Sequence, residues 1–82
     1  MKEYAIHKDA VRYVEEHVHE GRKILSDPVE DAIYKSILHE VAGYGPDQFA
    51  ISHNDVILQF GEVGFKVLNT LEKDGLIVSQ EA

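Results

Sequence analysis

With 82 residues and a formal net charge of −7, the chain is long enough for one small domain and too acidic to favour contact with phosphate backbones or anionic lipid heads. It contains no cysteine, which excludes a disulfide framework and a thiolate metal site. No apolar run reaches the roughly 18 residues of a membrane span, and residues 1–8 lack the apolar stretch of a signal peptide. We therefore expect a cytoplasmic protein with no membrane partner.

The negative charge is concentrated in the later part of the chain. Residues 1–26 hold five basic and five acidic side chains, whereas residues 27–82 hold three basic and ten acidic ones. Such an acidic surface favours solubility or a basic partner.

The first helix is expected to begin near His7, because apolar side chains recur there at steps of three and four. This stripe comprises Ile6, Ala10, Tyr13, Val14, His17, Val18, Gly21 and Leu25. The helix is expected to end at Gly21 or by Ile24, because Pro28 disfavours helical geometry in the preceding Asp27.

The second helix, expected from Asp27 to Ala42, has the clearest start in the chain. Asp27 is a suitable cap, Pro28 suits the first helical position, and Glu30 follows the cap by three residues. Its apolar side chains recur every fourth residue, at Val29, Ile33, Ile37 and Val41. Gly43 is the expected stop, and a turn follows it.

A third helix is predicted after Ser52, because Asp55 stands three residues later, as in a capping box. Gly61 and Gly64 then interrupt the apolar stripe. Either they separate the third helix from a fourth, or one continuous helix accepts two interior glycines at a cost of about 2 kcal/mol together. We favour the break, with the fourth helix ending at Gly75.

The end of the fourth helix carries a pattern, L-x-x-L-x-x-x-G-L-I. It is formed by Leu68, Leu71, Gly75, Leu76 and Ile77. The pattern resembles the end of the recognition helix in winged helix-turn-helix proteins, where the chain turns into the wing. The resemblance covers residues 27–78 and implies a helix-turn-helix from Ser52 to Asp74. An ordinary helix followed by a short strand has the same pattern, and too few residues follow Val78 for a full two-stranded wing.

The sequence therefore predicts a single domain, residues 1–82, that is all-α or nearly all-α. It would consist of four helices in a winged-helix-like arrangement with a short C-terminal strand at 76–78. Leu38, Leu68 and Leu71 are expected in its core.

No catalytic or cofactor motif is complete. His39 and Glu40 begin the zinc motif H-E-x-x-H, but Gly43 occupies its fifth position. His17 and His19 are two residues apart, so they point in different directions on a helix. We therefore expect a non-enzymatic protein without a metal or cofactor.

The candidate contact residues lie on the solvent side of the fourth helix: Phe65, Lys66, Asn69, Thr70 and Lys73. Phe65 lies off the line of inward residues, and is either a core residue or an exposed anchor for a partner.

We expect a small protein-binding or regulatory module whose partner is a basic protein or a second copy in a homodimer, which would form through the N-terminal helix. The alternative is a DNA-binding transcriptional regulator that acts as a dimer. DNA is the less favoured partner, because residues 47–82 contain no arginine. Clustering of Lys35, Lys66 and Lys73 in space would favour the alternative.

Overall fold

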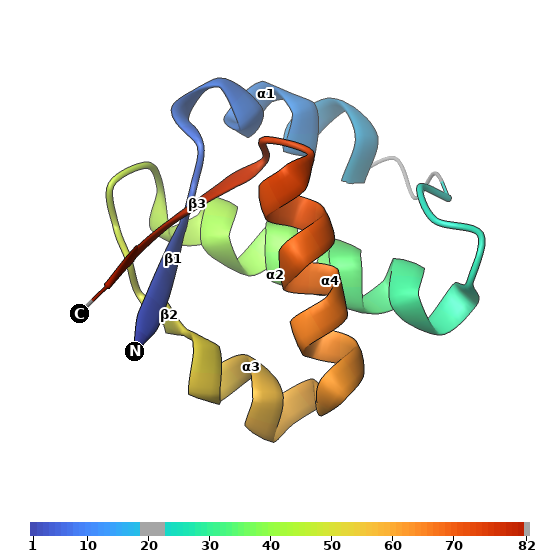
Figure 1. Cartoon of the computed structure of the whole chain (residues 1–82). Helices are drawn as coiled ribbons and strands as arrows, with labels where there is room; N and C mark the ends of the chain where they lie inside the picture. Colours follow the sequence, from blue (N-terminus) through green and yellow to red (C-terminus); the bar gives the residue numbers. More distant parts are fainter. Residues whose placement is uncertain (19–22, 82) are drawn as a thin grey trace.

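The computed structural model describes residues 1–18 and 23–81 as a set of helices packed on a three-stranded antiparallel sheet (Figure 1). In chain order the elements are β1 (Lys2–Ile6), a 3-10 turn η1 (Lys8–Ala10), α1 (Val11–Tyr13), a π-helical turn η2 (Val14–Val18), α2 (Pro28–Tyr44), β2 (Ile51–Ser52), α3 (His53–Phe60), α4 (Glu62–Lys73) and β3 (Ile77–Glu81).

The expected all-α class is wrong, because the fold is mixed α/β. Helices account for 62% of the described residues and strands for 16%. The sheet order is β2-β1-β3, so the unexpected strand β1 lies at its centre. Tyr4, Ala5 and Ile6 are almost completely buried, which explains why this segment pairs with other strands rather than beginning a helix.

The last strand is longer than expected, because β1 gives it a partner. The two strands pair antiparallel from Lys2 opposite Glu81 to Ile6 opposite Ile77. The expectation that a full two-stranded wing cannot form considered only the residues that follow Val78. The neighbour comes instead from the other end of the sequence.

The N-terminal helical region is irregular rather than a single α-helix. It opens with a 3-10 turn, where the His7 Nδ1 atom accepts a hydrogen bond from the Asp9 amide at 3.0 Å. An α-helical turn and a π-helical turn follow and end at Val18, with Ala10 and Val14 buried. Gly21, one of the two expected ends, lies outside the described residues. Ile24, the other expected end, is described and is not helical, so the helix does not reach it.

The second helix is confirmed. The Asp27 carboxylate accepts hydrogen bonds from the amides of Val29 at 2.8 Å and Glu30 at 3.0 Å, and thereby caps the first turn. The helix continues beyond the expected stop at Gly43 and ends at Tyr44. The residue that terminates it is Gly45, whose φ of 91° an ordinary L residue rarely adopts.

The break between the third and fourth helices is also confirmed, and it lies at Gly61, where φ is 69°. The capping box forms as predicted between Ser52 and Asp55. Gly64, by contrast, lies inside α4. A Cβ atom there would come within 2.8 Å of side-chain atoms of Phe60 and Val56, so this glycine allows α3 and α4 to pack closely.

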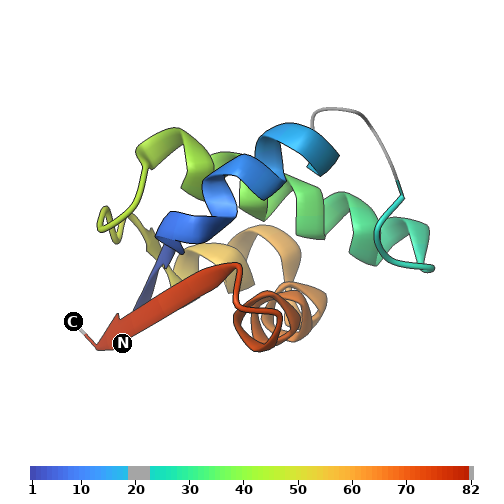
Figure 2. The ribbon, with the colours of Figure 1, turned by 90° about the horizontal axis from the view of Figure 1, so that it is seen from above.

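The core lies between α2, α4 and the sheet. Leu38, Leu68 and Leu71 are completely buried, as expected. Figure 2 shows the N-terminal helical turns crossing over α2, with α4 seen nearly end-on beside β3. The helix α2 packs against β1, η2 and α4. This packing leaves the outer sides of α3 and α4 facing solvent.

Candidate partner-binding surface

All five residues proposed from the sequence lie on α4, and the structure separates them into different surroundings. Phe65 is 45% exposed, so it is not a core residue. Asn69 and Lys73 are also exposed. The half-buried Thr70 donates its hydroxyl hydrogen bond to the Lys66 carbonyl at 3.1 Å, within the helix. Of the five, only Phe65 and Asn69 line the pocket described next.

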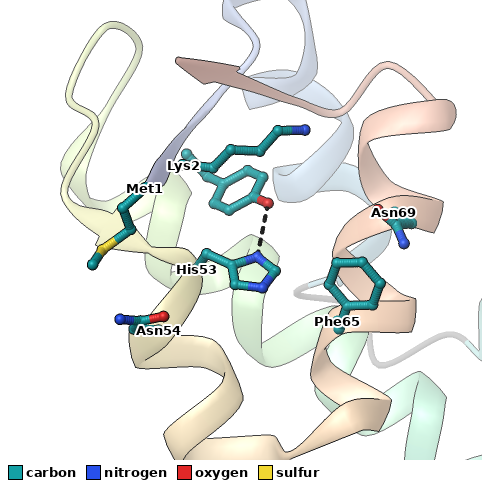
Figure 3. Close-up of a pocket in the computed structure, with 7 residues that line it drawn as sticks. Met1, Lys2, His53, Asn54, Phe65 and Asn69 are labelled. Carbon is teal, nitrogen blue, oxygen red and sulfur yellow. Dashed lines mark hydrogen bonds between the residues drawn. The ribbon is translucent and has the colours of Figure 1, made fainter. Parts of the chain in front are cut away.

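A pocket of about 480 Å³ opens between α4, the start of α3 and the start of β1 (Figure 3). Phe65 and Asn69 form its α4 side. The other lining residues come from the start of the chain and the start of α3: Met1, Lys2, Tyr4, His53 and Asn54. A volume of this size is within the range of small ligand pockets, so it accommodates one large side chain of a partner.

The pocket has aromatic walls, and two of its lining side chains make a polar contact. The Tyr4 hydroxyl lies 3.4 Å from the His53 Nδ1 atom, and this contact is the dashed line in Figure 3. The rings of His53 and Phe65 meet edge to face, with centroids 5.1 Å apart and planes at 76°. Burial raises the pKa of Tyr4, and the carboxylates of Glu72 and Glu81 raise it further. The hydroxyl therefore stays neutral at physiological pH.

Exposed apolar side chains accompany this pocket on the two helices. Leu58 on α3 is 86% exposed and lies one helical turn beyond Asn54, while Val63 on α4 is 38% exposed. We call Leu58, Phe65 and the pocket together the α3–α4 surface, because Leu58 lies on the same side of α3 as Asn54, which lines the pocket. Exposed apolar side chains beside a pocket are typical of sites that bind other molecules.

The lysines of the later chain do not form a free basic cluster. The Lys66 ammonium pairs with Glu30 of α2 at 3.0 Å, and Lys35 pairs with Asp31 at 2.8 Å. Of the three lysines considered from the sequence, only Lys73 has no ion pair within the described residues. Two of the three positive charges are therefore already balanced by carboxylates of the same chain.

The pocket residues that come before α4 in the chain are not predicted from the sequence. Tyr4 and Lys2 were missed because β1 was not predicted, and its alternation of Tyr4 and Ile6 is too short to identify a strand. His53 and Asn54 stand at the start of the predicted third helix, where no local pattern indicates a role for them. The capping box at Ser52 was the one local signal that located them, since it determines where α3 begins.

Within residues 1–18 and 23–81, no group of three or more histidine, aspartate or glutamate side chains is arranged to hold a metal ion. No helix in the same ranges is both long enough and apolar enough to cross a membrane. No family model, curated protein or solved structure matches the chain.

Proposed function

We propose that this protein is a small, non-enzymatic protein-binding or regulatory module that binds its partner through the α3–α4 surface. The observation that carries the proposal is the exposure of Leu58 and Phe65 beside the pocket. Exposed apolar area is unfavourable in water, and covering it on association is favourable by about 25 cal/mol per Å².

In this proposal, one apolar side chain of the partner enters the pocket and packs against the rings of Phe65 and His53. Asn54 and Asn69 also line the pocket, from α3 and α4, and their amides offer donors and acceptors to the partner's backbone (Figure 3). A large side chain enclosed in a pocket, with polar groups at its rim, is the arrangement in which interface energy concentrates.

The partner is expected to be basic near its contact residue. The chain carries a net charge of −7, and the carboxylates of Glu72 and Glu81 act on the Tyr4 hydroxyl in the pocket. Complementary charge mainly accelerates association, so binding to a basic partner should slow as salt increases.

We also propose that the chain has a winged-helix arrangement in which the wing is altered. A helix-turn-helix, α3 and α4 with Gly61 between them, leads into β3, as the resemblance implies. In place of a second wing strand that would follow β3, the neighbouring antiparallel strand is β1.

DNA binding by a dimer is the second proposal, and it ranks lower because Lys35 and Lys66 are already paired with carboxylates. Non-specific affinity for duplex DNA comes mainly from lysine and arginine releasing counterions from phosphates. A fluorescence anisotropy titration with a random duplex should give a dissociation constant above roughly 100 μM at physiological salt. Micromolar binding that weakens steeply with added salt would place this alternative first.

The main proposal is tested by binding with matched variants. Proteins are captured from the native cell with three tagged chains: the wild type, Phe65→Ala and Val29→Ala. The captured protein is then purified, and its affinity for each of the three chains is measured by titration. Val29 is 62% exposed on α2, so it is an apolar control outside the surface. Phe65→Ala should weaken binding about 30-fold, as loss of a central aromatic contact does, whereas Val29→Ala should not. Equal losses in the two variants would contradict the proposal.

A further inference from the structure

We propose that the outer edge of β3 pairs with β3 of a second copy of this chain, antiparallel and centred on Ser79, to give one continuous six-stranded sheet. This inference is independent of the partner-binding proposal, because it concerns the backbone of a different element. It specifies how a homodimer forms and which residues meet.

The register of the sheet determines which backbone groups of β3 are available. The His7 amide donates a hydrogen bond to the Leu76 carbonyl at 3.0 Å, so these two residues form a hydrogen-bonded pair with β1. In an antiparallel ladder such pairs alternate with pairs that exchange no hydrogen bonds. Val78 and Gln80 therefore also point their N–H and C=O groups at β1. The groups that point away from β1 belong to Ile77, Ser79 and Glu81.

The described residues leave this outer edge unpaired. β3 is a terminal strand of the sheet, and Figure 2 places it along one side of the molecule, with no described strand beyond it. The Ser79 hydroxyl donates to a Glu72 carboxylate oxygen at 2.5 Å, which occupies the side chain but not the backbone. Residues 77–80 contain no lysine and no proline, the usual protections of an exposed edge.

A second copy fits this edge because the strand is complementary to itself. With Ser79 opposite Ser79, Ile77 faces Glu81 of the other copy at both ends. Every outward N–H and C=O group of the three residues then has a partner, and Val78 faces Gln80 across the axis. The two Glu81 backbones lie about 14 Å apart, beyond the screening length of about 10 Å at 0.1 M salt. The like charges nearest the axis are the Glu72 carboxylates beside each Ser79, and each of them is paired with Lys2 of its own copy at 3.8 Å.

The dimer is expected to be weak and to tighten with salt. A five-residue ladder forms a small interface, for which a dissociation constant on the order of 10⁻⁴ M is appropriate. Each copy carries a net charge of −7, so added salt screens the repulsion between them. This salt dependence is opposite to that expected for a basic partner.

Sedimentation velocity over about 20 μM to 1 mM, which brackets that constant, tests the pairing. The wild-type chain should dimerise. Ser79→Ala should still dimerise, because it retains the outward N–H. Ser79→Pro should remain monomeric, since proline removes that N–H and is tolerated where it points out of the sheet. A monomeric wild type, or a Ser79→Pro variant that dimerises equally well, would overturn the proposal.

A spin label on Gln80→Cys tests the register without disturbing the backbone. The chain has no other cysteine, and Gln80 is exposed. In the proposed register the two labelled backbone positions lie about 8 Å apart, so strong dipolar broadening should appear with dimerisation. Dimers without broadening would mean that self-association uses another surface, and would overturn the proposal.

Hydrogen exchange of the Ile77 and Ser79 amides tests which molecule occupies the edge. If these amides are protected from exchange only when a different protein is bound, the edge binds that protein and the proposal is overturned.

Discussion

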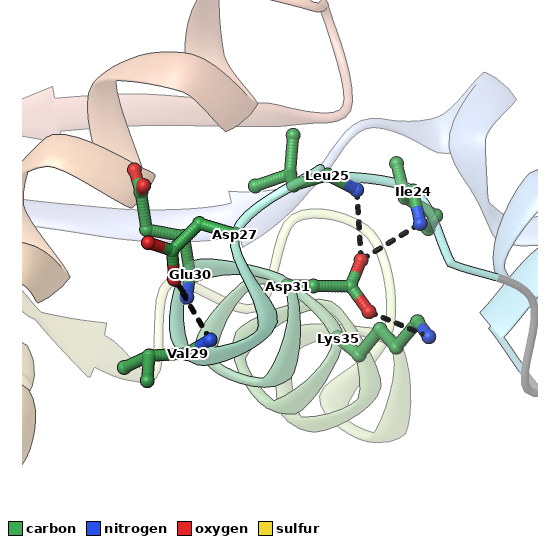
Figure 4. A network of polar contacts seen from close by, with 7 residues as sticks. All are labelled: Ile24, Leu25, Asp27, Val29, Glu30, Asp31 and Lys35. Atoms are coloured by element: carbon green, nitrogen blue, oxygen red, sulfur yellow. Dashed lines mark hydrogen bonds and ion pairs between the residues drawn. The ribbon is translucent and has the colours of Figure 1, made fainter.

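The start of α2 and the α3–α4 surface use their polar and charged groups in opposite ways. At the start of α2, the Asp31 carboxylate accepts hydrogen bonds from the Ile24 amide at 2.7 Å and the Leu25 amide at 2.8 Å, and it pairs with Lys35 (Figure 4). Asp27 caps the same helix. These hydrogen bonds and the ion pair attach the segment before α2 to the helix, so the groups contribute to the stability of the fold.

The α3–α4 surface is less involved in holding the fold. Leu58 and Phe65 remain exposed, and the amides of Asn54 and Asn69 border an open pocket. The capping box at Ser52 orients α3, but the apolar side chains beyond it contribute little to folding. The difference indicates that substitutions at the start of α2 should affect stability, and substitutions on the α3–α4 surface should affect binding.

The largest expected effect is on the inward side of α4. Leu71 is completely buried, and Leu71→Ala should lower the free energy of unfolding by about 2–4 kcal/mol, because it removes apolar contacts and leaves a cavity. Urea unfolding followed by circular dichroism measures the change. An unfolding midpoint equal to that of the wild type would mean that α4 is not packed on the core.

The second largest expected effect is the loss of thermal stability when Asp31 is replaced, and this loss should depend on pH. The hydrogen bond from Lys35, together with those from the Leu25 and Ile24 amides, lowers the pKa of Asp31 from 3.8 to about 2. A carboxylate with a lowered pKa stabilises the folded state above its unfolded pKa, and this stability is lost as pH falls through the folded pKa. Asp31→Asn should therefore melt at a lower temperature than the wild type at neutral pH.

Thermal melts from about pH 6 to pH 2 measure this prediction, since that window spans both pKa values. The gap between the wild type and Asp31→Asn should narrow as the pH falls below about 4. Glu40→Gln, at an exposed position of the same helix, is the matched control and should show no such narrowing. A gap that stays constant to pH 2 would indicate that the Asp31 charge does not stabilise the fold.

The smallest expected effect on stability is that of Phe65→Ala. This side chain is 45% exposed, so its truncation should change the free energy of unfolding by less than about 1 kcal/mol. The same urea series compares it with Leu71→Ala on the opposite side of α4. A loss as large as that of Leu71→Ala would make Phe65 a structural residue and remove the contrast between the two regions.

The elements that could be predicted are those whose signals are local. Asp27 and Pro28 mark the start of α2, and the Ser52 capping box marks the start of α3. The strand β1 could not be predicted, because its partners are residues 51–52 and 77–81, far along the chain. A five-residue strand has too few residues to reveal its periodicity, and its burial depends on contacts that no local pattern records.

The residues of the candidate site differ in the same way, because some are predictable from local spacing and others depend on tertiary packing. Phe65 and Asn69 could be placed on the outer side of α4 because helical spacing determines which side each residue faces. The ion pair that occupies Lys66 joins it to Glu30 on another helix, and Tyr4 reaches the pocket from β1. Both depend on tertiary packing, so the sequence identified one wall of the pocket and not the others.

The most direct test of the partner-binding proposal is photo-crosslinking in the native cell, with p-benzoylphenylalanine placed at Phe65 or at Val29. We expect one protein to crosslink at Phe65 and not at Val29, and we expect the purified form of that protein to bind the wild-type chain about 30-fold more tightly than Phe65→Ala. Crosslinking to nucleic acid at Phe65, or equal crosslinking at the two positions, would contradict the proposal.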